Sequence, residues 1–216
     1  MDTNKRIDEI DIIKALAIIG MVWHHIGLPF TNFITLFHMA AFFICSGIVY
    51  KEKYSEDVSS FIVFTKNKLR TLWFPYACCA IIFTLLNNTF LKIGFYSLDE
   101  RFYYDTKRLI IDCLRGFLFV KQTPMSAATW FLNALFFVSE FYCLFELILR
   151  KLHFQKISII QFIISVILLV FLYFIRNLLI SHKTIYIYIA HFILGYITFC
   201  LGVLFNKYKI IMSCPK

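Results

Sequence analysis

The sequence predicts an all-α membrane protein: a polytopic bundle of about six transmembrane helices with a cytoplasmic N-terminus. Hydrophobic residues make up 60% of its 216 positions and charged residues only 16%. A soluble domain averages about half apolar and a quarter charged residues. Several apolar runs also approach the ~20 residues that are needed to cross a bilayer. We therefore expect residues 1–216 to form a single membrane domain.

Six continuous apolar segments define the expected helices, at residues 10–28, 33–50, 72–95, 129–149, 157–180 and 185–206. Lipid leaves only helices or closed barrels to satisfy the backbone, and continuous apolar runs favour helices. Pro29 predicts a turn after the first segment, and Pro75 is tolerated in the first turn of the third. The charged stretch 109–120 is too short to span, so it either lies in the interface or folds back into the protein.

The net charge of +9 is spread over short basic clusters between the apolar segments. This distribution excludes nucleic acid as a partner, because nucleic-acid binding needs basic residues on one face of a compact domain. It instead fixes orientation by the positive-inside rule. A cytoplasmic N-terminus, with 96–128 outside, places the larger basic group inside: positions 5, 6, 51, 53, 66, 68, 70, 150, 151, 156, 207, 209 and 216, against 92, 101, 107, 108, 115, 121, 176 and 183.

The first apolar segment contains four ionisable residues: Asp11, Lys14, His24 and His25. Such residues are costly in a membrane and usually face a bundle interior or a wet cavity. On an ideal helix Lys14 and His25 lie within about 20° of each other, and Asp11 lies within about 40° of that face. His24 points about 100° away from His25. These positions predict a polar track along one face of the helix. The pattern is explained equally well if Asp11 and Lys14 extend to the membrane interface and the histidines only anchor the helix end.

Four short motifs, in order over residues 6–133, carry a resemblance to a known family. They are the run Arg6–His25 with its Lys14-x10-His25 spacing, the run Phe37–Gly47 reading FHMAAFFICSG, the basic residues Lys66, Lys68 and Arg70 ahead of Phe74-Pro75-Tyr76, and Trp130-Phe131-Leu132. Together they resemble the acyltransferase-3 family of integral membrane O-acyltransferases, and most closely its fucose 4-O-acetylase-like branch. Members of that family have longer chains, so this sequence resembles the N-terminal part of the domain, apparently truncated at its C-terminus.

The resemblance implies an enzyme that moves an acyl group, usually acetyl, from acyl-CoA to a sugar hydroxyl. It implies O-acetylation of a cell-surface or extracellular polysaccharide of the cell envelope, by a multi-pass protein of a bacterial inner (plasma) membrane. His25 matches the catalytic base, whose unperturbed pKa near 6.5 suits that task. Lys14 would bind a CoA phosphate or stabilise developing negative charge. His38 is either a second catalytic or orienting group or a polar residue satisfied within the bundle.

The resemblance also suggests binding residues and partners. Lys66, Lys68 and Arg70 would dock anionic CoA at the cytoplasmic mouth, unless they serve only as an orientation signal. Asp11 joins them as a candidate substrate-binding residue. The expected partners are membrane lipid, acyl-CoA and a glycan acceptor. Acetyl-CoA is expected as a donor substrate, with no bound cofactor, and no cysteine or histidine spacing predicts a metal site.

Two other functions remain open from the sequence. A transporter or flippase also needs charges within the membrane, but it should show an internal repeat or broken helices, and neither is visible. The second open possibility is a truncated membrane protein without catalytic activity. Among the remaining residues, Ser46 and Gly47 predict close helix packing, and Glu140 predicts an ion pair inside the bundle. His153, His182 and His191 receive no role.

Overall fold

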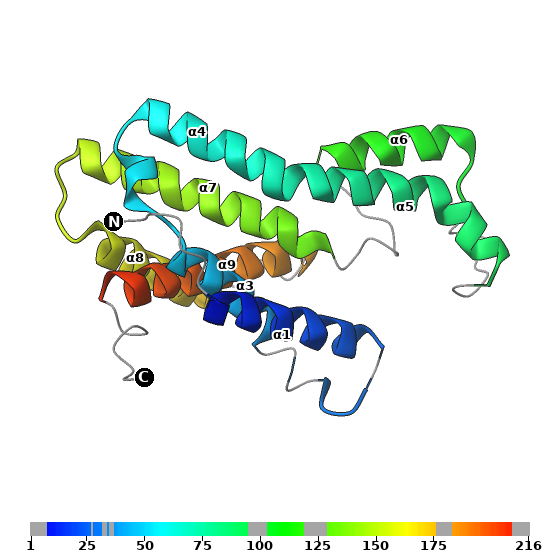
Figure 1. Cartoon of the computed structure of the whole chain (residues 1–216), viewed down its shortest axis with the longest axis horizontal. Helices are drawn as coiled ribbons and strands as arrows, with labels where there is room; N and C mark the ends of the chain where they lie inside the picture. The colour runs from blue at the N-terminus through cyan, green and yellow to red at the C-terminus, as the bar shows by residue number, and fades with distance from the viewer. Residues whose placement is uncertain are drawn as a thin grey trace. The chain divides into compact units, whose positions relative to one another are not determined.

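The structure is a computed structural model that describes residues 8–26, 28–31, 34, 37–94, 103–118, 129–175 and 183–208. Every secondary-structure element in these ranges is a helix (Figure 1), which confirms the all-α prediction. The elements are α1 (Asp8–His25), α3 (His38–Ile48), the 3-10 helix η1 (Glu52–Ser55), α4 (Val58–Lys68), the π-helical turn η2 (Leu69–Trp73), α5 (Phe74–Lys92), α6 (Thr106–Phe117), α7 (Trp130–Lys151), α8 (Ile157–Ile175) and α9 (Lys183–Lys207). The chain divides into two compact units: unit 1, Met1–Phe61 with Val138–Lys216, and unit 2, Ile62–Phe137.

Four helical stretches within the described ranges are long and apolar enough to cross a membrane: Val58–Lys92, α7, α8 and Ile189–Lys207 of α9. They correspond to the last four predicted segments. The first two predicted segments also form helices, but with different properties. Helix α1 carries three acidic residues in its first turn, and α3 has only 11 residues, fewer than the ~20 that span a bilayer. The structure is therefore that of a helical membrane protein.

In unit 1, helix α3 packs against α9 at very close range through glycine (Figure 1). A Cβ atom added at Gly47 of α3 would lie 2.1 Å from the Phe199 carbonyl oxygen. One added at Gly202 of α9 would lie 2.1 Å from the Ile44 carbonyl oxygen. Small residues let helix backbones approach in this way in membranes. The predicted packing role of Gly47 is confirmed, and Gly202 is its counterpart on α9.

The predicted third segment, 72–95, corresponds to α5 (Phe74–Lys92), but the continuous helix begins earlier than predicted. Helix α4 continues through η2 into α5 without a break, from Val58 to Lys92. Pro75 in the first turn of α5 lacks an N–H, and its ring would clash with the carbonyl group of Thr71 in a regular α-helix. A wider π-helical turn directly before Pro75 changes the hydrogen-bond pattern there, so the proline does not end the helix.

Helix α6 settles how the charged stretch after residue 100 is arranged within unit 2, because it folds back along α5. At one end Asn88 exchanges two hydrogen bonds with the backbone of Tyr104, of 2.6 and 2.9 Å. At the other end the Trp73 indole donates to the Phe117 carbonyl oxygen over 3.0 Å. The carboxylate of Asp112, only 3% exposed, lies between two arginines of the same helix, Arg108 at 3.8 Å and Arg115 at 3.3 Å.

Candidate functional site between α1 and α3

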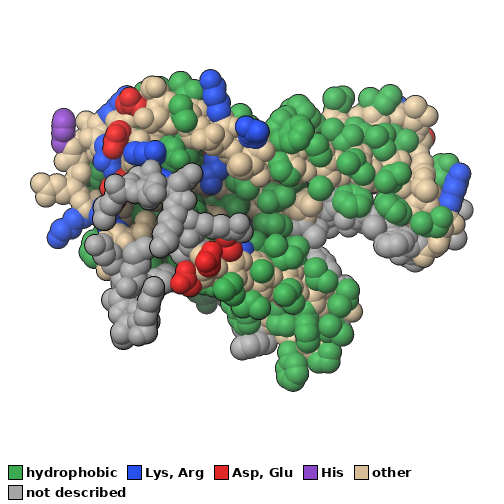
Figure 2. Space-filling model, in the orientation of Figure 1, with side chains coloured by type: hydrophobic (Ala, Val, Ile, Leu, Met, Phe, Trp, Pro, Cys, Tyr) green, Lys and Arg blue, Asp and Glu red, His purple; other side chains and the backbone are tan. Residues whose placement is uncertain are grey.

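Helix α1 packs one face against α3 and leaves the rest of its surface apolar. Ile10 and Ala17 are each 5% exposed and define the packed face. Figure 2 shows hydrophobic side chains over the visible surface of α1 and acidic residues at its N-terminal end. The exposed apolar residues are Ile12, Ile13, Leu16, Ile18, Ile19 and Val22. A membrane-facing helix with one packed face has this pattern, so polar residues on the packed face point into the protein.

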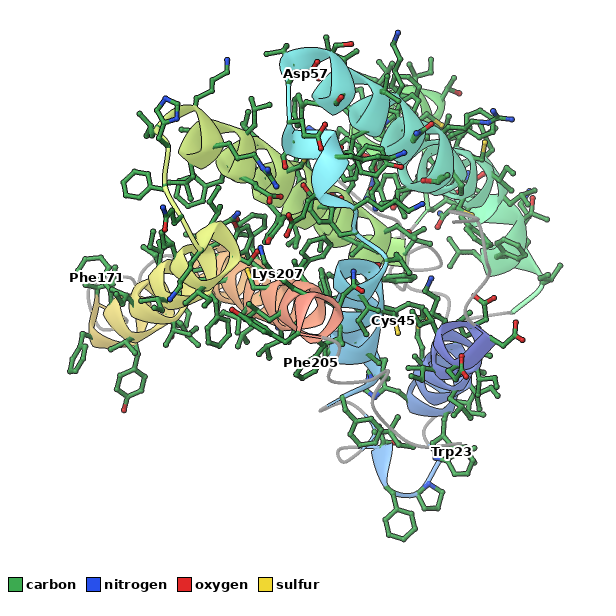
Figure 3. The ribbon with its side chains drawn as sticks, turned by 60° about the vertical axis from the view of Figure 1, so that its left-hand side comes forward. Trp23, Cys45, Asp57, Phe171, Phe205 and Lys207 are labelled. Carbon is green, nitrogen blue, oxygen red and sulfur yellow. The ribbon has the colours of Figure 1, made fainter. Side chains whose placement is uncertain are left out.

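Lys14 is half-buried beside this packed face. Ile10 of α1 packs with Cys45 and Ile48 of α3, and Figure 3 shows Cys45 on the side of α3 that faces α1. Lys14 lies four positions after Ile10, so the two residues are neighbours on α1. The predicted Lys14 therefore lies at the boundary between α1 and α3, where a charge is shielded from lipid. Asp11 is also half-buried, one turn nearer the N-terminus of α1.

His38, at the first position of α3, is 5% exposed. Its Nδ1 atom lies 2.9 Å from the Ile34 carbonyl oxygen. A carbonyl oxygen only accepts hydrogen bonds, so Nδ1 carries the proton and Nε2 of the neutral ring keeps its lone pair. The His38 ring stacks on that of His24, with the centroids 6.0 Å apart and an interplanar angle of 27°. Lys14 and His38 thus lie at different levels of the same contact between α1 and α3: His38 is beside His24, and Lys14 is near the Ile10–Cys45 contact.

The sequence pattern favoured the line through Lys14 and His25 as the functional face, and His24 lies outside that line. Measured from buried Ile10, Lys14 lies about 40° to one side of an ideal helix and His24 about 40° to the other. The packed face therefore includes both. His25 is the last residue of α1, and its side chain lies outside the described part of the structure, so its predicted role stays a prediction.

The three basic residues predicted to bind CoA lie on a helix, not in a loop before one. Lys66 and Lys68 belong to the last turn of α4, and Arg70 to η2. Lys66 and Arg70 are four positions apart and share a face, whereas Lys68 lies near the opposite side. The Lys68 ammonium group lies over the Phe64 ring, 5.2 Å from its centroid. Helical spacing thus places Lys66 and Arg70 on one side of the helix and Lys68 on another.

A buried charged group in unit 1 escaped the sequence analysis, which selected Glu140, a half-buried residue of α7. Glu146, two turns further on, is only 1% exposed. It accepts a hydrogen bond of 2.8 Å from the Tyr50 hydroxyl and lies 3.0 Å from Arg150. The signal in the sequence was the Glu146–Arg150 pair, since residues four apart on a helix are neighbours.

Arg150 extends this group to a second carboxylate, that of Glu52 in η1, at 3.2 Å. Glu52 also binds Lys207 of α9 at 2.8 Å. We call Tyr50, Glu52, Glu146, Arg150 and Lys207 the charged cluster. Partial burial alone would raise the pKa of Glu52, but the hydrogen bonds and positive charges of Lys207 and Arg150 outweigh it and lower that pKa. The cluster joins η1, α7 and α9, and its four charges sum to zero.

Among the described residues, no three His, Cys, Asp or Glu side chains form a group that could hold a metal ion. The site therefore offers imidazole and ammonium groups of single residues, which suit proton transfer and the binding of anionic or polar groups.

Comparison with known proteins identifies the family. The model of the family described as an acyltransferase domain, acyltransferase-3, matches residues 7–211. Neither the curated proteins nor the solved structures include one that matches this chain. The family match covers nearly all of the sequence, including α1, α3 and every other described helix. This chain belongs to the acyltransferase-3 family of membrane acyltransferases.

Proposed function

We propose that the protein transfers an acyl group, usually acetyl, from acyl-CoA to a sugar hydroxyl of a cell-surface or extracellular glycan. The observation that carries this proposal is the contact between α1 and α3, which contains half-buried Lys14 and buried His38. The chain that contains this contact belongs to a family of acyltransferases. Ionisable groups in a membrane domain are usually functional. Neither a transporter nor a non-catalytic protein would explain why the chain matches a family of acyltransferases.

The reaction needs a base, because a sugar hydroxyl is a poor nucleophile at neutral pH. His25, which matches the family motif, takes the hydroxyl proton as the oxygen attacks the thioester carbonyl carbon. A C–O bond forms, and the carbonyl oxygen carries negative charge; Lys14, about 16 Å from His25 along α1, is assigned to a CoA phosphate instead. Collapse of this intermediate breaks the C–S bond. The imidazolium then returns its proton to the CoA thiolate, which leaves as the thiol.

CoA binding is assigned to Lys66 and Arg70, which share one face of the helix formed by α4 and η2. Both side chains are exposed, and two cations one turn apart suit a ligand rich in phosphate. The proposed setting is a multi-pass protein of a bacterial cell membrane, with the donor arriving from the cytoplasm. The positive-inside distribution of Lys and Arg supports that orientation.

The direct test measures transfer from labelled acetyl-CoA in membranes that contain the protein. We expect label in base-labile esters of the glycan fraction, at a rate above that of matched membranes without the protein. A transporter or an inactive chain would give no such ester. Label that stays at the background level in every glycan fraction would contradict the proposed function.

The binding assignment has a matched control within the same five residues. The double variant Lys66→Gln/Arg70→Gln should raise KM for acetyl-CoA about tenfold and change kcat less, because the two cations bind a ligand and take no part in the chemistry. Lys68→Gln, which removes the same charge from the other side of the helix, should change KM less than about twofold. Equal KM values for the three proteins would reduce these residues to an orientation signal.

A further inference from the structure

His24 is a second imidazole in the contact between α1 and α3, and the proposed reaction gives it no task. It lies one turn beyond Gly20 on α1, and both residues face His38. The two rings are 6.0 Å apart between centroids and 27° from parallel, within the range of offset stacking between aromatic rings. The pair connects the end of α1 to the beginning of α3.

The His38 side chain is fixed on three sides. Its Nδ1–H donates to the Ile34 carbonyl oxygen over 2.9 Å. Gly20 leaves room for the base of the side chain, because a Cβ atom there would lie 3.4 Å from His38 Cβ and 3.1 Å from Ile34 Cγ2. The ring of His24 lies beside the His38 ring, 6.0 Å away between centroids. These contacts limit the orientation in which His38 can hold its Nε2 lone pair.

We propose that His24 is a positioning residue for His38. It holds the His38 ring in the plane that keeps Nδ1–H on the Ile34 carbonyl oxygen. It thereby fixes the direction of the Nε2 lone pair for the catalytic or orienting role that the family resemblance gives His38. The inference rests on the proposed acyl transfer for its effect on rate. The arrangement of the two rings does not depend on that reaction. A stacking ring is required at position 24, and its own proton is not.

The kinetic test compares two variants of His24, one that removes the ring and one that replaces it with a ring that carries no ionisable group. His24→Ala should lower kcat by between about tenfold and a hundredfold, because loss of orientation at a reacting group costs rate. Its KM for acetyl-CoA should stay within about twofold of the original value. His24→Phe restores a stacking face and should recover to within about threefold of the original kcat. Val22→Ala, at an exposed position of the same helix, is the control for shortening a side chain of α1.

A second measurement does not depend on activity. The ¹⁵N chemical shifts of His38, assigned by comparison with His38→Asn, report which ring nitrogen carries the proton. The original protein and His24→Phe should show the Nδ1–H form, and His24→Ala should show a mixture of both forms. If no sample transfers an acyl group, the proposed function fails and these shifts still decide the role of His24.

Three outcomes would overturn the proposal. An unchanged kcat in an active His24→Ala protein would show that the ring contact has no effect on the reaction. A loss in His24→Phe as large as in His24→Ala would show that the imidazole itself is needed. A His38 tautomer that is the same in all three proteins would show that the ring of His24 does not fix it.

Discussion

The charged cluster and the pair of histidines lie in the same unit, yet they satisfy buried polar groups in different ways. In the charged cluster Glu146 is held by Arg150 and Tyr50, and Glu52 by Arg150 and Lys207. In the histidine pair, His38 bonds to a backbone carbonyl oxygen and stacks on a second imidazole. The cluster neutralises opposite charges with one another, whereas the pair relies on a backbone hydrogen bond and a contact between rings.

Because of this difference, we assign the charged cluster to the stability of the fold and the histidine pair to the reaction. A buried charge that loses its partner is strongly destabilising, so we assign the ion pair of buried Glu146 with Arg150 to stability. Within the described residues, the His38 ring is hydrogen-bonded only through Nδ1, to the Ile34 carbonyl oxygen, so its other ring nitrogen stays available for a reaction. We therefore expect substitutions in the charged cluster to change the amount of folded protein, and substitutions at the histidines to change the rate per folded molecule.

The largest expected effect on stability follows from Glu146→Ala. It removes a residue that is 1% exposed and leaves Arg150 and Tyr50 without it. The free energy of unfolding in mild detergent should fall by about 3–5 kcal/mol, as when one partner of a buried pair is removed. Activity per folded molecule should stay unchanged.

The double variant Glu146→Gln/Arg150→Met is the control for this prediction. It leaves no lone charge at the pair and keeps an acceptor for Tyr50, so much of the lost free energy of unfolding should return. A loss of less than about 1 kcal/mol in Glu146→Ala would mean that the charged cluster is not the anchor described above.

A smaller loss is expected at the contact between α3 and α9, which supports the helix that carries His38. Gly47→Ala places a Cβ atom 2.1 Å from the Phe199 carbonyl oxygen, so the two backbones must move apart. Overpacking of this kind costs about 1–3 kcal/mol of unfolding free energy. Ser46→Ala, at the next position, should change it by less than about 0.5 kcal/mol. Equal values for the two variants would show that the close approach is not required.

The smallest effect concerns pH at the outer part of the charged cluster. The pKa of Glu52 is lowered in the folded protein, because Lys207 and Arg150 outweigh its partial burial. Its contribution to stability is therefore complete above the unfolded pKa of about 4.3 and is lost as pH falls through the folded pKa. Because Glu52 is 43% exposed, the contribution should stay below about 1 kcal/mol.

This prediction is checked by the difference in unfolding free energy between the original protein and Glu52→Gln. That difference should shrink as pH is lowered from about 6 to 3. A difference that grows with acid would contradict the assigned ion pairs.

Composition and the length of the apolar segments were enough to predict a helical membrane protein. The bilayer itself requires long apolar helices, whatever tertiary contacts they make. Gly47 was predictable for a similar reason, because small residues permit close packing of membrane helices. The continuation of α4 through Pro75 was not predictable in this way. Proline usually ends or kinks an α-helix, and the π-helical turn that precedes Pro75 depends on local hydrogen bonds that the sequence pattern does not reveal. The return of α6 along α5 was left open because it depends on pairs distant in sequence, such as Asn88 with Tyr104.

The candidate site was predicted in part. Both motif-derived residues, Lys14 and His38, lie on helices that pack against each other, and their chemical roles stay predictions. His24 was misplaced because helical angles show which residues share a face but not which face packs. Ile10 and Ala17, which are apolar like their exposed neighbours, identify that face only once α3 is in place.

The most direct test of the whole account is the rate of acetyl transfer from acetyl-CoA by His25→Ala, measured per folded molecule in membranes. If His25 is the general base, the rate should fall by about 10²–10⁴-fold, while the free energy of unfolding stays within about 1 kcal/mol of the original value. Full activity in His25→Ala would contradict the mechanism. A fall in rate explained entirely by loss of folded protein would contradict it as well, and would assign His25 a structural role.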